Sequence, residues 1–134
     1  DPRYETDEYK GVSDAVSCVV SCFGPTDLTM IPDMQNPLDD VFLGLSGGRD
    51  PRAVLREMSP LHVVTKETPF PPCLLAHGTG DTVVPYFMAT QMADKLISFG
   101  KDVRLLTVTD APHEDTFWSW PLIEDIYAFI QEHI

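Results

Sequence analysis

The apolar positions of this chain form two kinds of pattern, which predict strands alternating with helices. Short runs of aliphatic and β-branched residues occupy residues 15–23, 73–77 and 103–108, and turn-forming residues follow each of them, as is typical of buried strands. Apolar residues recur every three or four positions over residues 86–99 and again from Pro121 onward, which predicts two amphipathic helices. Strands joined by crossover helices lie parallel, so the pattern predicts an α/β fold with a parallel sheet and right-handed connections.

The stretch between the first two apolar runs is proline-rich and irregular. Two short helices are predicted in it, over residues 37–43 and 51–58, and Asp50 is placed to cap the second. We interpret residues 26–72 as a lid-like insertion over the sheet edge, within one domain that spans residues 1–134.

Composition narrows the possible partners. The 134 residues are 43% hydrophobic, as expected of a globular chain, and the formal net charge of -12 argues against nucleic acid and anionic membranes. No apolar stretch is long enough to cross a membrane. The three cysteines are odd in number and lie in apolar runs, which favours buried free thiols and a reducing compartment such as the cytoplasm.

Two residues with catalytic potential follow successive predicted strands. Asp81 lies in a glycine-rich turn after the run at 73–77, and His113 lies in the loop after the run at 103–108. The carboxyl ends of parallel strands share one edge of a sheet, so we expect Asp81 and His113 to lie on neighbouring loops. Such an acid fixes the tautomer of a histidine base. The simpler alternatives are a turn-closing aspartate and a solvated histidine.

These segments also resemble a known family. His77-Gly78-Thr79-Gly80-Asp81-Thr82-Val83-Val84-Pro85 matches the pattern His-Gly-x-x-Asp-x-x-Val-Pro, and Ala111-Pro112-His113-Glu114 follows in the expected order. The chain thereby resembles the C-terminal half of the α/β-hydrolase fold, in the esterase and lipase branch related to acetyl-, xylan- and feruloyl-esterases and prolyl-oligopeptidase-like hydrolases. The resemblance implies that Asp81 and His113 are the acid and base of a serine esterase. A carboxylate oxygen of Asp81 is then expected about 2.6–3.2 Å from a ring nitrogen of His113, or somewhat farther away without the serine. Its substrate would be a small ester, possibly an acylated carbohydrate, and it would need no cofactor or metal.

The nucleophile of such an enzyme is not evident in the chain. Gly44-Leu45-Ser46-Gly47-Gly48 matches G-x-S-x-G, but Pro51 follows too soon for the long helix that a nucleophile elbow requires. We therefore interpret the match at Ser46 as coincidental. The serine is expected upstream of residue 1, in a longer protein, and this chain alone is expected to be inactive.

Other polar and aromatic residues are given structural interpretations. Asp27 is expected to cap a turn, and no role is assigned to His62, His77 or His133. His113 with Glu114 and Asp115 would make a poor metal cage, because adjacent ligands lack the helical spacing of such sites. The aromatic residues after His113 favour packing over substrate binding; they are Phe117, Trp118 and Trp120.

Two other classes of protein remain possible. One is a non-catalytic binding module on a degenerate hydrolase scaffold, and the other is a flavodoxin- or receiver-like signalling domain. In the hydrolase interpretation, the strand that leads to the upstream serine would pair with the first strand of this chain. Without that partner the first strand is expected to leave an unguarded edge, which favours a homodimer through that edge. The residues expected to carry its unpaired backbone groups are Val16, Cys18, Val19 and Val20.

Overall fold

The core of the protein is a three-stranded parallel sheet. A computed structural model describes residues 7–30 and 47–134, so the helix expected over residues 37–43 and Ser46 lie outside the described residues. The strands β1 (Val19–Cys22), β2 (Cys73–Gly78) and β3 (Val103–Val108) follow one another in that order across the sheet. Both neighbouring pairs are parallel, which confirms the predicted α/β fold.

Strand β1 is shorter than the apolar run that predicts it. Val19 is its first residue and lies opposite Cys73, the first residue of β2. Pairing of residues 15–18 would require the preceding segment, 69–72, as a partner, and three of its four residues are prolines without an amide hydrogen. The strand therefore begins where its partner can first donate hydrogen bonds.

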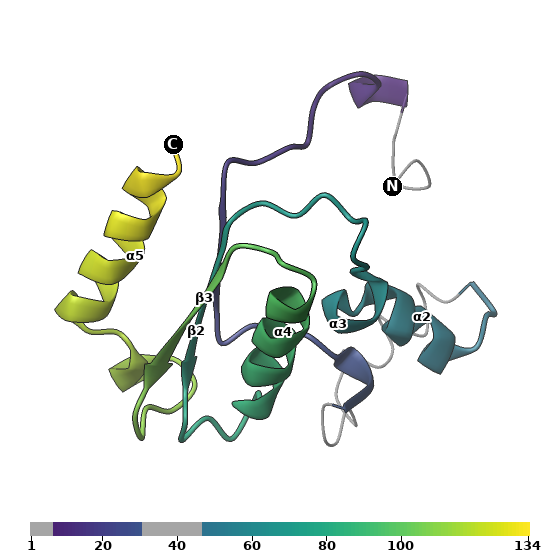
Figure 1. Cartoon of the computed structure of the whole chain (residues 1–134). Coiled ribbons are helices and arrows are strands. Elements are labelled where there is room, and N and C mark those ends of the chain that lie inside the picture. The colour runs from purple at the N-terminus through teal and green to yellow at the C-terminus, as the bar shows by residue number, and fades with distance from the viewer. Residues whose placement is uncertain (1–6, 31–46) are drawn as a thin grey trace.

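Helices cover both faces of the central strand, as Figure 1 shows. The residues of β2 alternate between the faces: Cys73 and Leu75 pack with Met92 and Leu96 of α4 (Phe87–Ser98). On the opposite face, Ala76 belongs to a cluster that includes residues from the start of α5 (Trp120–Glu132). All six residues of β2 are buried for this reason.

The chain between β1 and β2 runs beside α4. It contains the 3-10 turn η3 (Leu28–Met30) and the short helices α2 (Pro51–Met58) and α3 (Pro60–Val63), and two further 3-10 turns are η2 (Asp7–Tyr9) and η4 (Asp115–Phe117). Asp50 caps α2 by accepting a hydrogen bond from the amide of Arg52 at 3.1 Å, as expected. The interpretation of residues 26–72 as a lid-like insertion stays a prediction.

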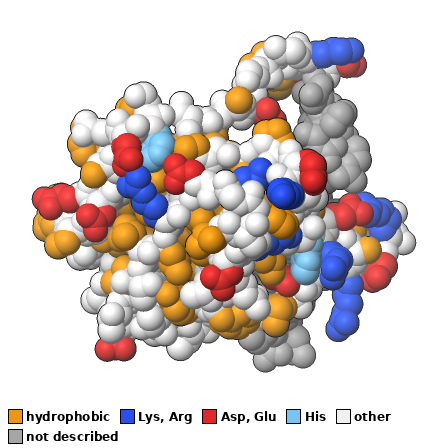
Figure 2. Space-filling view, viewed as in Figure 1, with side chains coloured by type: hydrophobic (Ala, Val, Ile, Leu, Met, Phe, Trp, Pro, Cys, Tyr) orange, Lys and Arg blue, Asp and Glu red, His pale blue; other side chains and the backbone are white. Residues whose placement is uncertain are grey.

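Charges of both signs are interspersed with apolar side chains over the face shown in Figure 2. This face therefore carries no continuous basic surface of the kind that nucleic acid requires. None of the helices within residues 7–30 and 47–134 is both long and apolar enough to cross a membrane.

Glycines bring the two loops that follow β2 and β3 into contact. A Cβ atom at Gly78 would overlap with the carbonyl oxygen of Ala111, and one at Gly80 would lie 2.9 Å from the carbonyl oxygen of Asp110. The same closeness lets the amide of Gly80 donate to the Ala111 carbonyl at 3.1 Å and the amide of Asp110 donate to Thr79 Oγ1 at 2.8 Å. The two loops can therefore lie this close only because Gly78 and Gly80 have no side chains.

We predict that Gly78→Ala lowers the free energy of unfolding by about 3 kcal/mol, because the new methyl group meets backbone that cannot rotate away. The matched control is Gly24→Ala, where the new methyl group meets the movable hydroxyl of Ser21. Denaturant unfolding of both variants measures the difference, and equal losses would contradict the account.

Candidate active site

The loop after β2 holds a buried carboxylate in a fixed orientation. Asp81 is 8% exposed, and its Oδ1 accepts hydrogen bonds from the amides of Val83 and Val84, both at 2.8 Å. These two backbone donors leave Oδ2 directed toward the loop that follows β3. The local sequence produces this turn because the aspartate side chain bonds to amides two and three residues ahead of it.

The histidine predicted from sequence meets this carboxylate. Nδ1 of His113 lies 2.8 Å from Oδ2 of Asp81, within the expected range, so the geometric prediction is confirmed. Since an ionised carboxylate only accepts hydrogen bonds, Nδ1 carries the proton and Nε2 of the neutral ring has a free lone pair. The His113 side chain is 22% exposed, so the ring is largely buried and still reaches solvent.

The surroundings of Asp81 favour its charged form. Burial raises the pKa of the carboxyl, but hydrogen bonds from His113 and from the amides of Val84 and Val83 outweigh burial and hold the pKa below its usual value. The carboxylate is therefore ionised at neutral pH and can stabilise a positive charge on the neighbouring imidazole.

A second histidine supports the same carboxylate, and sequence reasoning assigned it no role. His77 is 1% exposed, and its Nε2 lies 2.8 Å from the carbonyl oxygen of Val84 and 3.2 Å from Oδ2 of Asp81. Because a carbonyl only accepts, Nε2 carries the proton and presents it close to the carboxylate as well. The signal for this contact is the spacing of four residues between His77 and Asp81.

Aromatic side chains surround the His113 ring. The ring of Phe23, the residue directly after β1, lies 4.5 Å from the His113 ring between centroids. Phe117 is fully buried and Trp118 is 45% exposed, and both contact Phe23 edge-on. The packing interpretation holds for Phe117, but it is wrong for Trp120, which is 78% exposed. No sequence pattern indicated Phe23.

Backbone strain is concentrated at the same place. Within residues 7–30 and 47–134, four residues other than glycine have positive φ: Phe23, Asp110, Glu114 and Asp115. Three of them lie in the loop that carries His113, and the fourth packs against its ring. Such conformations persist only where the surroundings impose them, and they cluster at functional sites.

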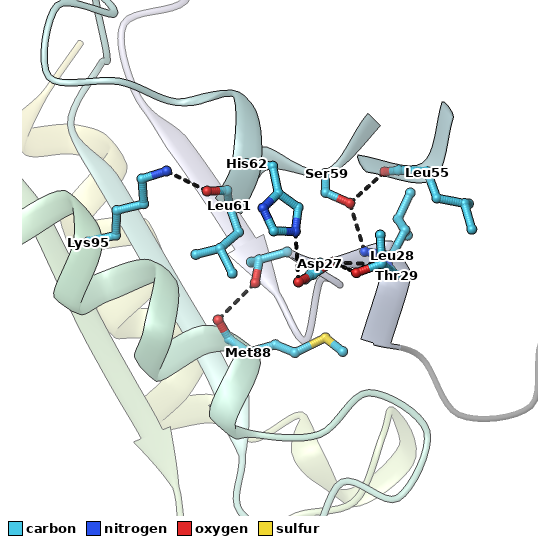
Figure 3. A network of polar contacts seen from close by, with 10 residues as sticks. Asp27, Leu28, Thr29, Leu55, Ser59, Leu61, His62, Met88 and Lys95 are labelled. Atoms are coloured by element: carbon cyan, nitrogen blue, oxygen red, sulfur yellow. Dashed lines mark hydrogen bonds and ion pairs between the residues drawn. The ribbon is translucent and has the colours of Figure 1, made fainter. Parts of the chain in front are cut away.

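A second carboxylate–imidazole pair lies away from His113, in the turn after β1 (Figure 3). Oδ1 of Asp27 accepts from the amide and hydroxyl of Thr29 at 3.0 and 2.6 Å, which confirms the expected cap. Its Oδ2 lies 2.9 Å from Nε2 of His62 in α3, a contact that sequence reasoning missed. Burial raises the pKa of Asp27, but its bonds to Thr29 and the charge of His62 outweigh that effect and lower it.

The other candidate groups do not form a reactive centre. Burial raises the pKa of the Cys73 thiol to about 11 and also raises that of Cys22, so neither is activated as a thiolate. No cluster of three potential metal ligands occurs in the described part of the chain, where His113, Glu114 and Asp115 do not converge.

Solved structures with a similar fold include esterases. A truncated carbohydrate esterase from gut microbiota matches with a TM-score of 0.73 and 25% identity, over 88% of this chain and 42% of that one. The bifunctional GH43-CE protein of Bacteroides eggerthii matches with a TM-score of 0.71 and 25% identity, over 94% and 17%. An esterase of Thermogutta terrifontis, solved with butyrate, matches with a TM-score of 0.68 and 21% identity, over 95% and 47%. The chain thus spans less than half the length of these proteins.

Comparison of the sequence with family profiles agrees with the fold similarity to hydrolases. Residues 12–134 match the profile of the prolyl oligopeptidase family. No curated protein matches the chain in a direct search.

The pKa of Asp81 leads to a prediction about stability. A carboxyl whose pKa is lower in the folded state stabilises the fold above its unfolded pKa of about 4, and this contribution is lost as the pH falls through the folded value. We expect Asp81→Asn to lower the free energy of unfolding at pH 7 by about 1–3 kcal/mol. The difference from wild type should shrink as the pH falls below about 4.

Denaturant unfolding of wild type and Asp81→Asn between pH 3 and pH 8 measures this difference. Asp110→Asn, which removes an exposed acid from the facing loop, controls for net charge. A difference that stays constant over the whole range would show that the charge on Asp81 does not stabilise the fold.

Proposed function

Because the chain belongs to the prolyl oligopeptidase family of α/β-hydrolases, we propose that it supplies the acid and base of a serine-dependent carboxylic ester hydrolase. Asp81 is the proposed acid and His113 the proposed base. The observation that carries this proposal is the 2.8 Å contact between Nδ1 of His113 and Oδ2 of Asp81. Family membership also removes the flavodoxin- or receiver-like interpretation, which is wrong.

The geometry supports the following proton movements. Nε2 of His113 accepts the proton of a serine hydroxyl while the serine oxygen attacks the ester carbonyl, and Asp81 stabilises the resulting imidazolium. The imidazolium then donates that proton to the departing alkoxide, which leaves as an alcohol. A water molecule then attacks the acyl-serine while His113 accepts its proton, and the same proton returns to the serine oxygen. The products are a carboxylic acid and the free serine. No step requires a cofactor.

The proposed substrate is a small ester, and an acylated carbohydrate is favoured by the fold similarity to a carbohydrate esterase at 25% identity. The serine is proposed to precede residue 1, because the nucleophile of an α/β-hydrolase comes before the acid and the histidine along the chain. Ser46 lies outside the described residues, and its interpretation as a coincidental match stays a prediction. The alternative, a non-catalytic module, is disfavoured because the Asp81–His113 contact has the geometry that catalysis needs.

We predict that the 134-residue chain hydrolyses p-nitrophenyl acetate no faster than its Ser46→Ala and His113→Ala variants. In a longer protein that includes the upstream serine, His113→Ala should lower kcat/KM at least about a thousandfold, because the serine then lacks its base. Initial rates at pH 8 measure both effects. Serine-dependent hydrolysis by the short chain that Ser46→Ala abolishes would place the nucleophile within it.

We also propose that the isolated chain forms a homodimer through the outer edge of β1. The amides of Val19 and Phe23 donate to the carbonyls of Pro72 and Ala76, so both point toward β2. By the alternation of a parallel strand, the outward-facing groups are those of Val20 and Cys22, and the expectation that included Val19 is wrong. No strand pairs with this edge in the described part of the chain, and Val16 beside it is 58% exposed.

We predict that light scattering shows a dimer at high protein concentration and that Val20→Pro shifts it toward monomer. Proline at this position removes an outward donor and leaves the bonds to β2 in place. Far-ultraviolet circular dichroism of the variant checks that it is folded. A wild-type chain that stays monomeric would contradict the proposed interface.

A further inference from the structure

The side chain of Phe23 closes one side of the space around His113. Its ring centroid is 4.5 Å from that of His113, and the two ring planes are inclined at 55°. Phe117 and Trp118 contact Phe23 at 4.9 and 5.7 Å between centroids, so Phe23 is itself supported by other aromatic rings. The Phe23 ring can therefore resist displacement by the imidazole.

The backbone of Phe23 is strained in the conformation that produces this contact. Its φ is 42°, in a region that residues other than glycine rarely adopt, although Gly24 follows immediately in the chain. Its amide donates to the carbonyl of Ala76 at 2.8 Å and thereby continues the pairing with β2. The chain thus turns sharply while the phenylalanine is still attached to the sheet.

Buried polar contacts hold the turn that follows Phe23, as Figure 3 shows for its neighbourhood. The hydroxyl of Thr26 donates to the carbonyl of Met88 in α4 at 2.8 Å, and the carbonyl of Thr26 accepts from the amide of Leu61 at 2.9 Å. Asp27 is 3% exposed and joins the turn to His62. The turn is tied to two helices, so the strain at Phe23 cannot relax without breaking buried hydrogen bonds.

We propose that Phe23 is a positioning residue that holds the His113 imidazole in the single ring orientation with Nδ1 at Asp81 and Nε2 toward the nucleophile. The inference rests on the proposed function and adds a residue to it. A rotation of the imidazole that carries Nδ1 away from Asp81 would instead break this hydrogen bond. The ring proton would then no longer be held on Nδ1, and a proton on Nε2 would leave the serine without a base. The Asp81 hydrogen bond holds only one nitrogen of the ring, whereas the Phe23 ring, 4.5 Å away between centroids, blocks the rotation of the imidazole away from Asp81.

Nitrogen NMR of the His113 ring in the 134-residue chain tests this directly, because the proton is fixed on Nδ1 only while that nitrogen donates to Asp81. Wild type should show the Nδ1-protonated tautomer. In Phe23→Leu, the ratio of the Nε2-protonated to the Nδ1-protonated form should rise about three- to tenfold, the range that one aromatic pair corresponds to. Leucine is chosen because, like phenylalanine, it is unbranched at Cβ. Phe23→Tyr keeps the aromatic ring and should show the wild-type ratio.

The chain contains a matched control in α5. The ring of Phe129 lies 4.4 Å from that of His133, and Phe129 is 2% exposed, so Phe129→Leu removes a similar pair away from the site. It should leave the tautomers of His113 unchanged. If Phe23→Leu does not fold, Trp118→Leu takes its place, because Trp118 is half-exposed and supports Phe23; it should shift the ratio in the same direction, by less.

The outcomes separate this inference from the proposed function. A wild-type His113 that already mixes both tautomers would overturn the Asp81–His113 assignment and this inference together. If wild type shows the Nδ1-protonated tautomer but the ratio is unchanged in Phe23→Leu, the role of Phe23 alone is overturned. The same holds for an unchanged ratio in Trp118→Leu where that variant is used instead. An equal shift in Phe129→Leu would also overturn it, since general loosening would then explain the effect.

Discussion

The arrangement of the site depends on keeping one buried carboxylate ionised. The side chain of Asp81 has no exposed surface, and an isolated charge in that position would be strongly unfavourable. Two backbone amides donate to one of its oxygens, and His113 donates to the other, with the proton of His77 close by. These donors come from the loop after β2 and from the loop after β3, so the charge is stable only while the two loops stay in contact. Gly78 makes this possible because it lets the loop after β2 touch the loop after β3.

Strained backbone conformations lie at the same edge of the sheet. Positive φ angles occur at Phe23 on one side of His113 and at Asp110, Glu114 and Asp115 in its own loop. Buried polar contacts around Asp27 hold the turn after β1, and aromatic rings fill the space between that turn and His113. Within residues 7–30 and 47–134, every residue other than glycine with a positive φ lies in the loop of His113 or packs against its ring. This concentration is what a site with a defined imidazole orientation requires.

Much of this architecture follows from the sequence. The runs at 73–77 and 103–108 predicted β2 and β3, and parallel pairing then placed Asp81 beside His113, because strand ends at one edge must meet. The length of β1 was overestimated because the prolines that limit it lie in the partner segment, more than fifty residues away. Phe23 could not be predicted, since its contact depends on an unusual φ and not on a periodic pattern. The Asp27–His62 pair was missed for a related reason, because the two residues are 35 positions apart and meet only through packing of α3.

The most direct test is a neutron crystal structure of the 134-residue chain near pH 8, which would show the hydrogen atoms on the His113 ring. We expect a deuteron on Nδ1 that points to Oδ2 of Asp81, and no deuteron on Nε2. A deuteron on Nε2 with Nδ1 bare, or a His113 ring out of hydrogen-bonding distance of Asp81, would contradict it.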